Sequence, residues 1–531
     1  MKQNHISRST IPALVQQAAL DFSKHTAIEE EGQKISYEEL NDIRQQWACA
    51  FIAAGVQHGD RVAIWAPNVR EWIYAAIGAH SVGAMIVPVN TRMKGAEAGY
   101  VLRASGAKIL CTVSGFLGFD YPAMLKEEAL PALQTIVMLR GQSTPVKQVH
   151  CVSWQQFLTS GGNVHATQVE QRSAAVKPED VSDLIFTSGT TGNPKGVKTS
   201  HAQNLKVFEV WSELVGLRRD DRYLIVNPFF HSFGYKAGWL AALIRGATIL
   251  PMAVFDAEKI MQRIAEEKIS VLPGPPTLYQ TILASPNISK YDLSSLRLAV
   301  TGAAAIPVSL IHRMRDELHF ATVLTAYGLT ESCGVVTMCR DGDDPELIAN
   351  TSGRAIPDVE VRCVNEQNEE VMRGSPGEIV LRGYNVMQGY FENPEATKEA
   401  IDADGWLHTG DIGVMDKNGY LRITDRIKDM FIVGGFNVYP AEIENLIVTY
   451  KGIAQVAVIG LPDERMGEVA AACIVPVVGV QINKDEFLAW CKQHMANYKV
   501  PKRVEIMEAL PMNATGKVQK FVLRDRLTGK I

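Results

Sequence analysis

The stretch TSGTTGNPKGVKTSH, residues 187–201, gathers glycines, hydroxylated side chains and lysines in one short segment. Hydroxyl groups, a lysine ammonium and backbone N–H groups that glycine leaves accessible all donate hydrogen bonds to negatively charged oxygens. A triphosphate such as that of ATP is therefore the first candidate ligand. We expect the phosphates to be bound by Thr187, Ser188, Gly189, Thr190, Thr191 and Lys195.

This segment does not follow the P-loop pattern G-x-x-x-x-G-K-[ST], because Lys195 lies between Pro194 and Gly196. A strand-like run, LIF, precedes the loop, and the next helix is expected only at Ser200, where Gln203 completes a capping box. The loop should therefore join two strands and neutralise phosphates without a helix dipole. A plain flexible hairpin is one alternative, and ATP hydrolysis through a P-loop is another.

TSGTTGNPKGV resembles the signature loop of the adenylate-forming superfamily, which contains acyl-CoA synthetases, luciferases and peptide-synthetase adenylation domains. The family's other blocks follow in order: YGLTES (327–332), GEIVLRG (377–383), GWLHTGD (405–411), DRIKDMFIVGGFNVYPAEIE (425–444) and NATGKVQK (513–520). The resemblance covers nearly the whole chain. It implies that a carboxylate attacks the α-phosphorus of ATP to give an acyl-adenylate and pyrophosphate. A thiol then attacks the acyl carbon and AMP leaves.

The resemblance assigns catalytic and nucleotide-binding roles to residues of these blocks. Glu331 would bind Mg²⁺, with Thr187 beside it, because this ion prefers hard oxygen ligands. Thr330 would donate to the α-phosphate, and Tyr327 would contact adenine. Lys517 would place its positive charge between the carboxylate and the α-phosphate.

Asp411 and Arg426 resemble the pair that binds the ribose hydroxyls, and a hairpin through NGYLRITD would bring them together. Lys428 matches the family's hinge, around which a small C-terminal domain rotates after adenylation. Gly434 and Gly435 would then lie against the thiol of coenzyme A. A plain turn and a surface ion pair are the alternatives for these blocks.

His231, in PFFHSFG, resembles the residue near the acyl carboxylate and the thiol entry, although a hydrogen-bonded core histidine is an equal alternative. Gly302 and Ala303, in TGAAAIP, are assigned to the nucleotide-binding residues. We expect that segment and Trp239 to line or approach the acyl pocket.

Composition and charge narrow the class of protein. A chain of 531 residues with 47% hydrophobic residues predicts a globular protein of more than one domain. The net charge of −5 argues against a nucleic-acid or anionic-membrane surface. Eight scattered cysteines without close pairs favour a reducing compartment, and no apolar leader or membrane span is evident. We therefore expect a cytoplasmic protein, and the sequence leaves a homodimer open.

The order of apolar runs predicts an α/β fold with a large N-terminal domain of doubly wound sheets, residues 1–426. Strands are expected at RVAIWAP, MIVPVN, KILCTV, YLIVNPFF, ATILPMAVF, VLPGPP and LRLAVTG. From about Gly353, short strand-like runs separated by turn signals predict a small antiparallel β unit. Residues 427–531 are expected to form a small α/β domain, with Pro440 in the first turn of one helix and Asn483 capping another, and the resemblance implies that this domain is mobile. Its last 40 residues, 492–531, are basic, which fits either a solvated helix face or phosphate binding.

The leading functional hypothesis is an ATP-dependent acyl-CoA ligase. Transfer of the acyl group to a carrier-protein thiol is one alternative, and a non-catalytic nucleotide-binding protein is another. The region from Ala326 to Pro357 is similar to bacterial medium-size acyl-CoA ligases, including some that activate ring-bearing acids from steroid breakdown. The acid is thus expected to be a fatty or a ring-bearing acid.

Overall fold

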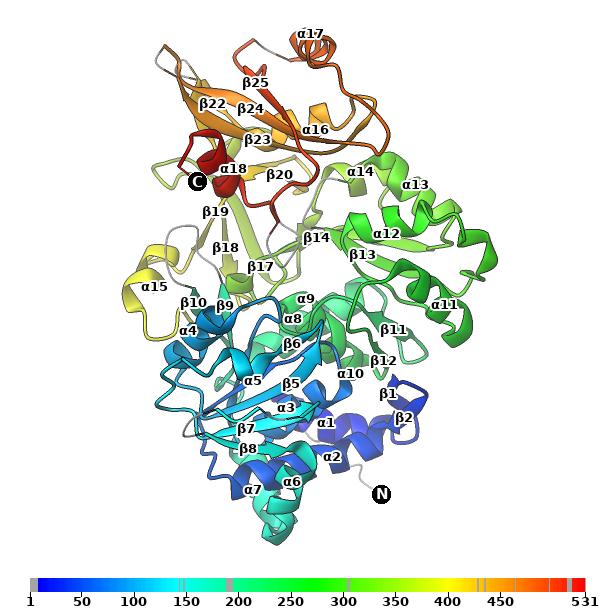
Figure 1. The fold of residues 1–531 in the computed structure, drawn as a ribbon, viewed down its shortest axis with the longest axis vertical. Coiled ribbons are helices and arrows are strands. Elements are labelled where there is room, and N and C mark those ends of the chain that lie inside the picture. The colour runs from blue at the N-terminus through cyan, green and yellow to red at the C-terminus, as the bar shows by residue number, and fades with distance from the viewer. Residues whose placement is uncertain are drawn as a thin grey trace.

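A computed structural model describes most of the chain. The described residues are 8–142, 144–146, 149–187, 194–302, 306–426, 429–433, 436–463, 465–495, 497–512 and 518–530; the side chains of residues 425, 426, 436 and 437 are outside the description. The elements of residues 427–531 lie at one end of the molecule, and those of the N-terminal part fill the rest (Figure 1).

The largest sheet is mostly parallel and has the strand order β10-β9-β4-β3-β5-β7-β8, with β6 paired to β5. Its strands are β3 (Arg61–Trp65), β4 (Met85–Pro88), β5 (Ile109–Phe116), β6 (Phe119–Asp120), β7 (Thr135–Arg140), β8 (His150–Ser153), β9 (Val181–Thr187) and β10 (Lys195–Ser200). The strands expected at RVAIWAP, MIVPVN and KILCTV are therefore confirmed. The predicted hairpin around the glycine-rich loop is the antiparallel pair β9–β10.

The second group of strands contains three of the four remaining expected runs, YLIVNPFF, ATILPMAVF and LRLAVTG. Its strands are β1 (Thr26–Glu30), β2 (Gln33–Ser36), β11 (Arg222–Ile225), β12 (Thr248–Pro251), β13 (Leu298–Gly302), β14 (Thr322–Tyr327), β15 (Thr337–Met338) and β16 (Arg354–Ala355). They form the orders β11-β12-β1-β2 and β13-β14-β15-β16. The prediction of a strand at VLPGPP was wrong. Only Val271 forms bridges there, one to Tyr223 and one to Leu298, both parallel. The three prolines in that run cannot donate backbone hydrogen bonds to a ladder.

The helices of the N-terminal part include one that is buried on all sides. Every residue of α3 (Arg70–Ser81) after Arg70 is buried, as expected for a helix enclosed by other elements. It packs closely on α2 (Tyr37–Ala53), because a Cβ at Gly78 would lie 2.4 Å from the Cβ of Trp47. Others are α1 (Ile11–Asp21), α4 (Gly95–Ser105), α5 (Tyr121–Met124), α6 (Trp154–Ser160), α7 (Ala166–Ala175), α8 (His201–Leu214), α9 (Ser232–Gly234), α10 (Ala241–Arg245), α11 (Ala257–Glu267), α12 (Pro276–Leu283), α13 (Val308–Asp316), α14 (Pro345–Asn350) and α15 (Pro394–Ala400).

The predicted antiparallel β unit follows. Its strands, in the order β17-β18-β19-β20, are β17 (Val359–Val364), β18 (Pro376–Gly383), β19 (Leu407–Met415) and β20 (Leu421–Arg426). In Figure 1 these strands lie between the N-terminal sheets and the C-terminal elements.

The C-terminal elements form a separate sheet with its own apolar cores. Its strands are β21 (Phe431–Val433), β22 (Phe436–Val438), β23 (Ile453–Asp463), β24 (Gly467–Pro476) and β25 (Arg503–Ile506), and its helices are α16 (Pro440–Ile447), α17 (Lys484–His494) and α18 (Lys520–Leu527). Pro440 is in the first turn of α16, and the Asn483 side chain accepts hydrogen bonds at the start of α17, so both local predictions are confirmed. The boundary at residues 426 and 427 stays a prediction.

Two neighbouring histidines are buried in the N-terminal part. His80 donates from Nε2 to the carbonyl of Ser182 (3.1 Å), and its ring lies 5.3 Å from that of His201. Burial lowers the pKa of His80 from its ordinary value of 6.5 to about 4, although the charge of Asp183 opposes this. Burial also holds the pKa of His201 well below its ordinary value. Both rings are therefore neutral in the folded protein at pH 7.

We predict that the free energy of unfolding falls as the pH falls from 6.5 to 4. In this range the histidines are protonated in the unfolded chain but stay neutral in the folded protein. At pH 4 this difference at His80 alone would lower the free energy of unfolding by roughly 3 kcal/mol. Urea denaturation at several pH values measures the slope of the free energy of unfolding against pH. His80→Gln should flatten it, whereas replacement of the exposed His150 with glutamine should leave it unchanged. An unaltered slope in His80→Gln would contradict the assignment.

Candidate nucleotide and acyl site

The ends of the glycine-rich loop are held opposite each other by the β9–β10 ladder. Thr187, the last residue of β9, pairs in register with Lys195, the first residue of β10. The helix that follows starts as predicted: Ser200 caps α8 in a capping box with Gln203. The other loop residues expected to bind phosphate, Ser188, Gly189, Thr190 and Thr191, lie outside the described residues.

Glu331 lies beside this hairpin, although 144 residues separate it from Thr187 along the chain. It is in the short 3₁₀ turn Thr330–Ser332, which follows β14. Its carboxylate oxygen Oε1 accepts hydrogen bonds from Thr187 Oγ1 (3.2 Å) and from Tyr390 Oη (3.0 Å). Within the described part of the chain, no donor contacts its second oxygen, Oε2. The structure thus brings together both residues that were predicted to bind the metal ion.

Tyr390 belongs to this group and was missed by the sequence analysis. Lys195 Nζ lies 5.1 Å from the centre of its ring, within the range of a cation–π contact. Burial, followed by the charge of Glu331, raises the pKa of Tyr390, so the phenol stays protonated and donates. The available signal was the run GYFENP, in which two aromatic residues stand among turn-forming residues.

The segment around Tyr390 is fixed to β10 by backbone hydrogen bonds. Lys198 N donates to Gly389 O (3.0 Å), and Phe391 N donates to Gly196 O (2.7 Å). On its other side, Met387 N donates to the carbonyl of Glu331 (2.8 Å). The chain from 387 to 391 therefore links the β9–β10 hairpin, called the phosphate hairpin below, to the turn Thr330–Ser332, called the Glu331 turn. It sets the distance between the two.

The predicted ribose pair is assembled by the hairpin that the sequence suggested. Asp411 on β19 and Arg426 on β20 are directly opposite in the antiparallel register. Tyr327 Oη donates to Asp411 Oδ2 (2.6 Å), and both side chains are largely buried. The adenine residue and the ribose residue predicted from separate blocks are thus neighbours. The position of the Arg426 side chain is outside the description.

Gly302 ends β13 next to the strand that leads to Tyr327. It pairs in register with Ala326, and a Cβ on Gly302 would lie 2.7 Å from the Ala326 carbonyl oxygen. Only glycine fits this close backbone approach without a shift of β14. Ala303, its predicted partner in nucleotide binding, lies outside the described residues.

His231 lies in the segment that connects β11 with the buried helix α10. Its Nδ1 accepts a hydrogen bond from Phe233 N (3.2 Å) and caps α9, so a neutral ring carries its proton on Nε2. It is half-buried rather than a fully enclosed core residue. Trp239 is fully buried, stacks on Tyr235 at 4.8 Å between ring centres, and lies 6.0 Å from Trp72.

The remaining predicted site residues are in the C-terminal blocks. Lys428, Gly434, Gly435 and Lys517 lie outside the described residues. Met512 and Val518, on either side of the segment that contains Lys517, form an antiparallel bridge. The described lysine that follows, Lys520, pairs with Glu444 of α16 at 2.9 Å.

The described residues contain no cluster of three or more His, Cys, Asp or Glu side chains that could hold a metal ion by themselves. A magnesium ion does not require one, because it commonly binds through one or two carboxylates, water and substrate phosphates. The carboxylate of Glu331 and the hydroxyl of Thr187, 3.2 Å apart, are hard oxygen donors of this kind. No helix in the described part of the chain is long and apolar enough to cross a bilayer.

Removing the Tyr327 hydroxyl should weaken nucleotide binding more than chemistry. We predict that Tyr327→Phe raises the KM for ATP roughly tenfold and changes kcat little. The reason is that the carboxylate of Asp411 loses the hydrogen bond that Tyr327 donates to it. Steady-state kinetics over a range of ATP concentrations measure this split. Tyr291→Phe, which removes an exposed hydrogen bond to Glu258, is the matched control. An unchanged KM in Tyr327→Phe would contradict the placement of the nucleotide.

Comparisons with known proteins show the family to which the chain belongs. The profile of the AMP-binding enzyme family matches residues 15–391, and that of the AMP-binding enzyme C-terminal domain matches residues 442–517. A 3-[(3aS,4S,7aS)-7a-methyl-1,5-dioxo-octahydro-1H-inden-4-yl]propanoyl:CoA ligase of Rhodococcus jostii (strain RHA1) is 48% identical over 97% of this chain and 98% of its own length. The Mycobacterium tuberculosis ligase of the same name is 47% identical over 97% and 98%.

Solved structures extend the likeness to the whole fold. The anthranilate CoA ligase AuaEII in complex with anthranoyl-AMP superposes with a TM-score of 0.88, 26% identity and 98% coverage of both chains. ATP-bound MatB from Rhodopseudomonas palustris gives a TM-score of 0.82 and 29% identity, again with 98% coverage of both chains. With two family profiles, relatives near half identity over almost the full length and the same α/β fold, the chain belongs to the AMP-binding enzyme family, within the adenylate-forming superfamily of acyl-CoA synthetases.

Proposed function

We propose that the protein is an ATP-dependent, AMP-forming acyl-CoA ligase that activates a ring-bearing propanoic acid from steroid degradation. The observation that carries the reaction is the meeting of Thr187, Lys195, Glu331 and Tyr390 at the loop end of the β9–β10 hairpin. These groups come from three distant segments and suit a polyphosphate with its cation. Membership of the AMP-binding enzyme family supports the same reaction.

The choice of acid rests on the relatives. The two ligases at 48% and 47% identity are named for a propanoyl chain on a methylated bicyclic ring with two oxo groups. An acid of this class is our first candidate substrate for this chain, and a fatty acid is the second. Coenzyme A is the proposed thiol, because both relatives are named as CoA ligases.

The residues of the site would act in sequence. Asp411, oriented by Tyr327, would accept hydrogen bonds from the ribose hydroxyls, with Arg426 beside it. Thr187 and Lys195 would contact the phosphates, together with the loop between them. A magnesium ion held by Glu331 would neutralise phosphate charge, so that the carboxylate of the acid can approach the α-phosphorus. His231 would lie near the acyl carboxylate and the entering thiol.

The C-terminal blocks complete the proposal. Lys517 would stabilise the charge that develops during adenylation, and Lys428 would serve as the hinge for a rotation that brings Gly434 and Gly435 to the thiol. We further propose that the boundary between the two domains lies at residues 426 and 427. A cytoplasmic location remains a prediction.

Acid-dependent exchange of labelled pyrophosphate into ATP tests the first half-reaction, and thioester formation tests the second. The purified protein would be given ATP, magnesium and a panel of aliphatic, aryl and bicyclic propanoic acids, first with CoA and then with a pantetheinylated carrier protein. We expect exchange and CoA thioester with a bicyclic propanoate. Exchange with transfer only to the carrier would favour the carrier-loading alternative. ATP binding without exchange for any acid would favour a non-catalytic protein.

A further inference from the structure

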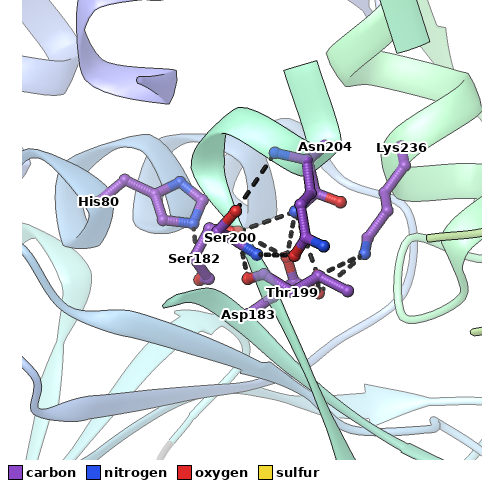
Figure 2. Close-up of polar contacts among 8 residues, drawn as sticks. His80, Ser182, Asp183, Thr199, Ser200, Asn204 and Lys236 are labelled. Carbon is purple, nitrogen blue, oxygen red and sulfur yellow. Dashed lines mark hydrogen bonds and ion pairs between the residues drawn. The ribbon is translucent and has the colours of Figure 1, made fainter. Parts of the chain in front are cut away.

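A buried ion pair lies at the base of the phosphate hairpin, away from the residues that are proposed to contact substrate. Lys236 Nζ is 3.0 Å from Asp183 Oδ1, and their side chains are 0% and 1% exposed. Lys236 also donates to Thr199 Oγ1 at 2.8 Å. Figure 2 shows Lys236 reaching this group from one side and His80 from the other.

The carboxylate of Asp183 has a donor at every acceptor position that the group commonly uses. Oδ1 accepts from Lys236 and from Thr199 Oγ1 (2.9 Å). Oδ2 accepts from Ser182 Oγ (2.8 Å) and from Asn204 Nδ2 (2.7 Å). Such complete pairing offsets part of the lost hydration, yet an apolar pair of similar size is often at least as stable. Stability alone therefore gives a weak reason for two charges in this position.

The hairpin geometry gives a stronger reason. Asp183 and Thr199 are directly opposite in the β9–β10 register, and so are Thr187 and Lys195 at the loop end. Four residues along a strand are about 13 Å, and residues at even spacing share a face. The ion pair and the phosphate-contacting residues are therefore on one face of the same two strands, at opposite ends.

Lys236 connects this base to the other two segments of the site. It follows Tyr235, whose N–H donates to the carbonyl of His231 (2.9 Å), and both begin the π-helical segment η2 (Tyr235–Leu240). The buried Cys333 follows the Glu331 turn. Burial raises the pKa of its thiol to about 12, and the charges of Lys236 and Asp183 both act on it. A Cβ on the adjacent Gly334 would lie 3.2 Å from Ser232 Cβ, so these segments are in direct contact.

We propose that Lys236 is a positioning residue for adenylation: with Asp183 and Thr199 it fixes the phosphate hairpin relative to the His231 segment and the Glu331 turn. This inference rests on the proposed function. The phosphates of ATP and the acid must be aligned only in the first half-reaction, since pyrophosphate has left before the thiol attacks. Misplacement of the hairpin should therefore slow adenylation selectively.

The test compares the two half-reactions in Lys236→Met, Asp183→Asn and the double variant. Single-turnover adenylation, and thioester formation from supplied acyl-adenylate and CoA, are each normalised to folded protein. We expect Lys236→Met to slow adenylation about tenfold or more, with a much smaller change in thioester formation. The double variant should regain the melting temperature lost by the single variants without regaining the adenylation rate. Lys206→Met, which breaks the exposed pair with Asp358, is the matched control.

Thr199→Val keeps both charges and removes the hydroxyl between them. If Lys236→Met does not fold, this variant tests whether adenylation is slowed selectively. Equal loss in both half-reactions, or recovery of the adenylation rate in the double variant, would overturn the inference. Failure of the unmodified enzyme to adenylate any acid would instead contradict the proposed function. In that case ATP affinity by calorimetry still tests the positioning role: we expect weaker binding in Lys236→Met and Thr199→Val, and affinity equal to the Lys206→Met control would overturn it.

Discussion

Replacing Lys517 with alanine is expected to reduce acid-dependent pyrophosphate exchange by roughly 10²–10³-fold, the usual cost of removing one group that stabilises charge in a transition state. The lysine ammonium would be the positive charge placed between two reacting anions, the carboxylate and the α-phosphate. Formation of the thioester from supplied acyl-adenylate should stay within about twofold of the unmodified enzyme, because that step involves no attack on phosphorus.

Lys530→Ala provides a control, since this lysine is also near the C-terminus and is exposed. It should leave both half-reactions unchanged. A similar loss of both steps in Lys517→Ala would show that the residue supports the whole enzyme rather than adenylation, and an unchanged exchange rate would remove it from the catalytic group.

Replacing Glu331 with glutamine is expected to lower the adenylation rate by roughly 10²–10³-fold and to raise the magnesium concentration needed for half-maximal activity. Glutamine keeps an oxygen that can accept from Thr187 and Tyr390, so the local hydrogen bonds survive. Only the negative charge is lost. Rates measured from micromolar to millimolar magnesium separate an effect on cation binding from an effect on the chemical step.

Glu366→Gln, at an exposed position after β17, removes the same charge without touching the site. It should have the magnesium dependence of the unmodified protein. If Glu331→Gln shows that same dependence and rate, Glu331 does not hold the cation, and its hydrogen bond to Thr187 would have only a structural role.

Local features of the fold were predicted from the sequence where neighbouring residues decide them. The capping box of Ser200 and Gln203, Pro440 at the start of α16 and the hairpin around the glycine-rich loop all depend on residues a few positions apart. The hairpin that places Asp411 opposite Arg426 is of the same kind. The strand prediction at VLPGPP failed because its apolar pattern resembles a strand, while its prolines limit bridging to one residue, Val271.

The sequence by itself determined the family, the reaction class and the order of the elements, because short motifs carry these and need no distant partner. Only the tertiary structure decided that Tyr390 joins Lys195 to Glu331, and that Lys236 is buried against Asp183. A lysine in an apolar run and an aspartate in an apolar strand have no visible relation along the chain. Their relation arises when the sheet, α8 and η2 close around them, since a buried charge must then find its partner in space.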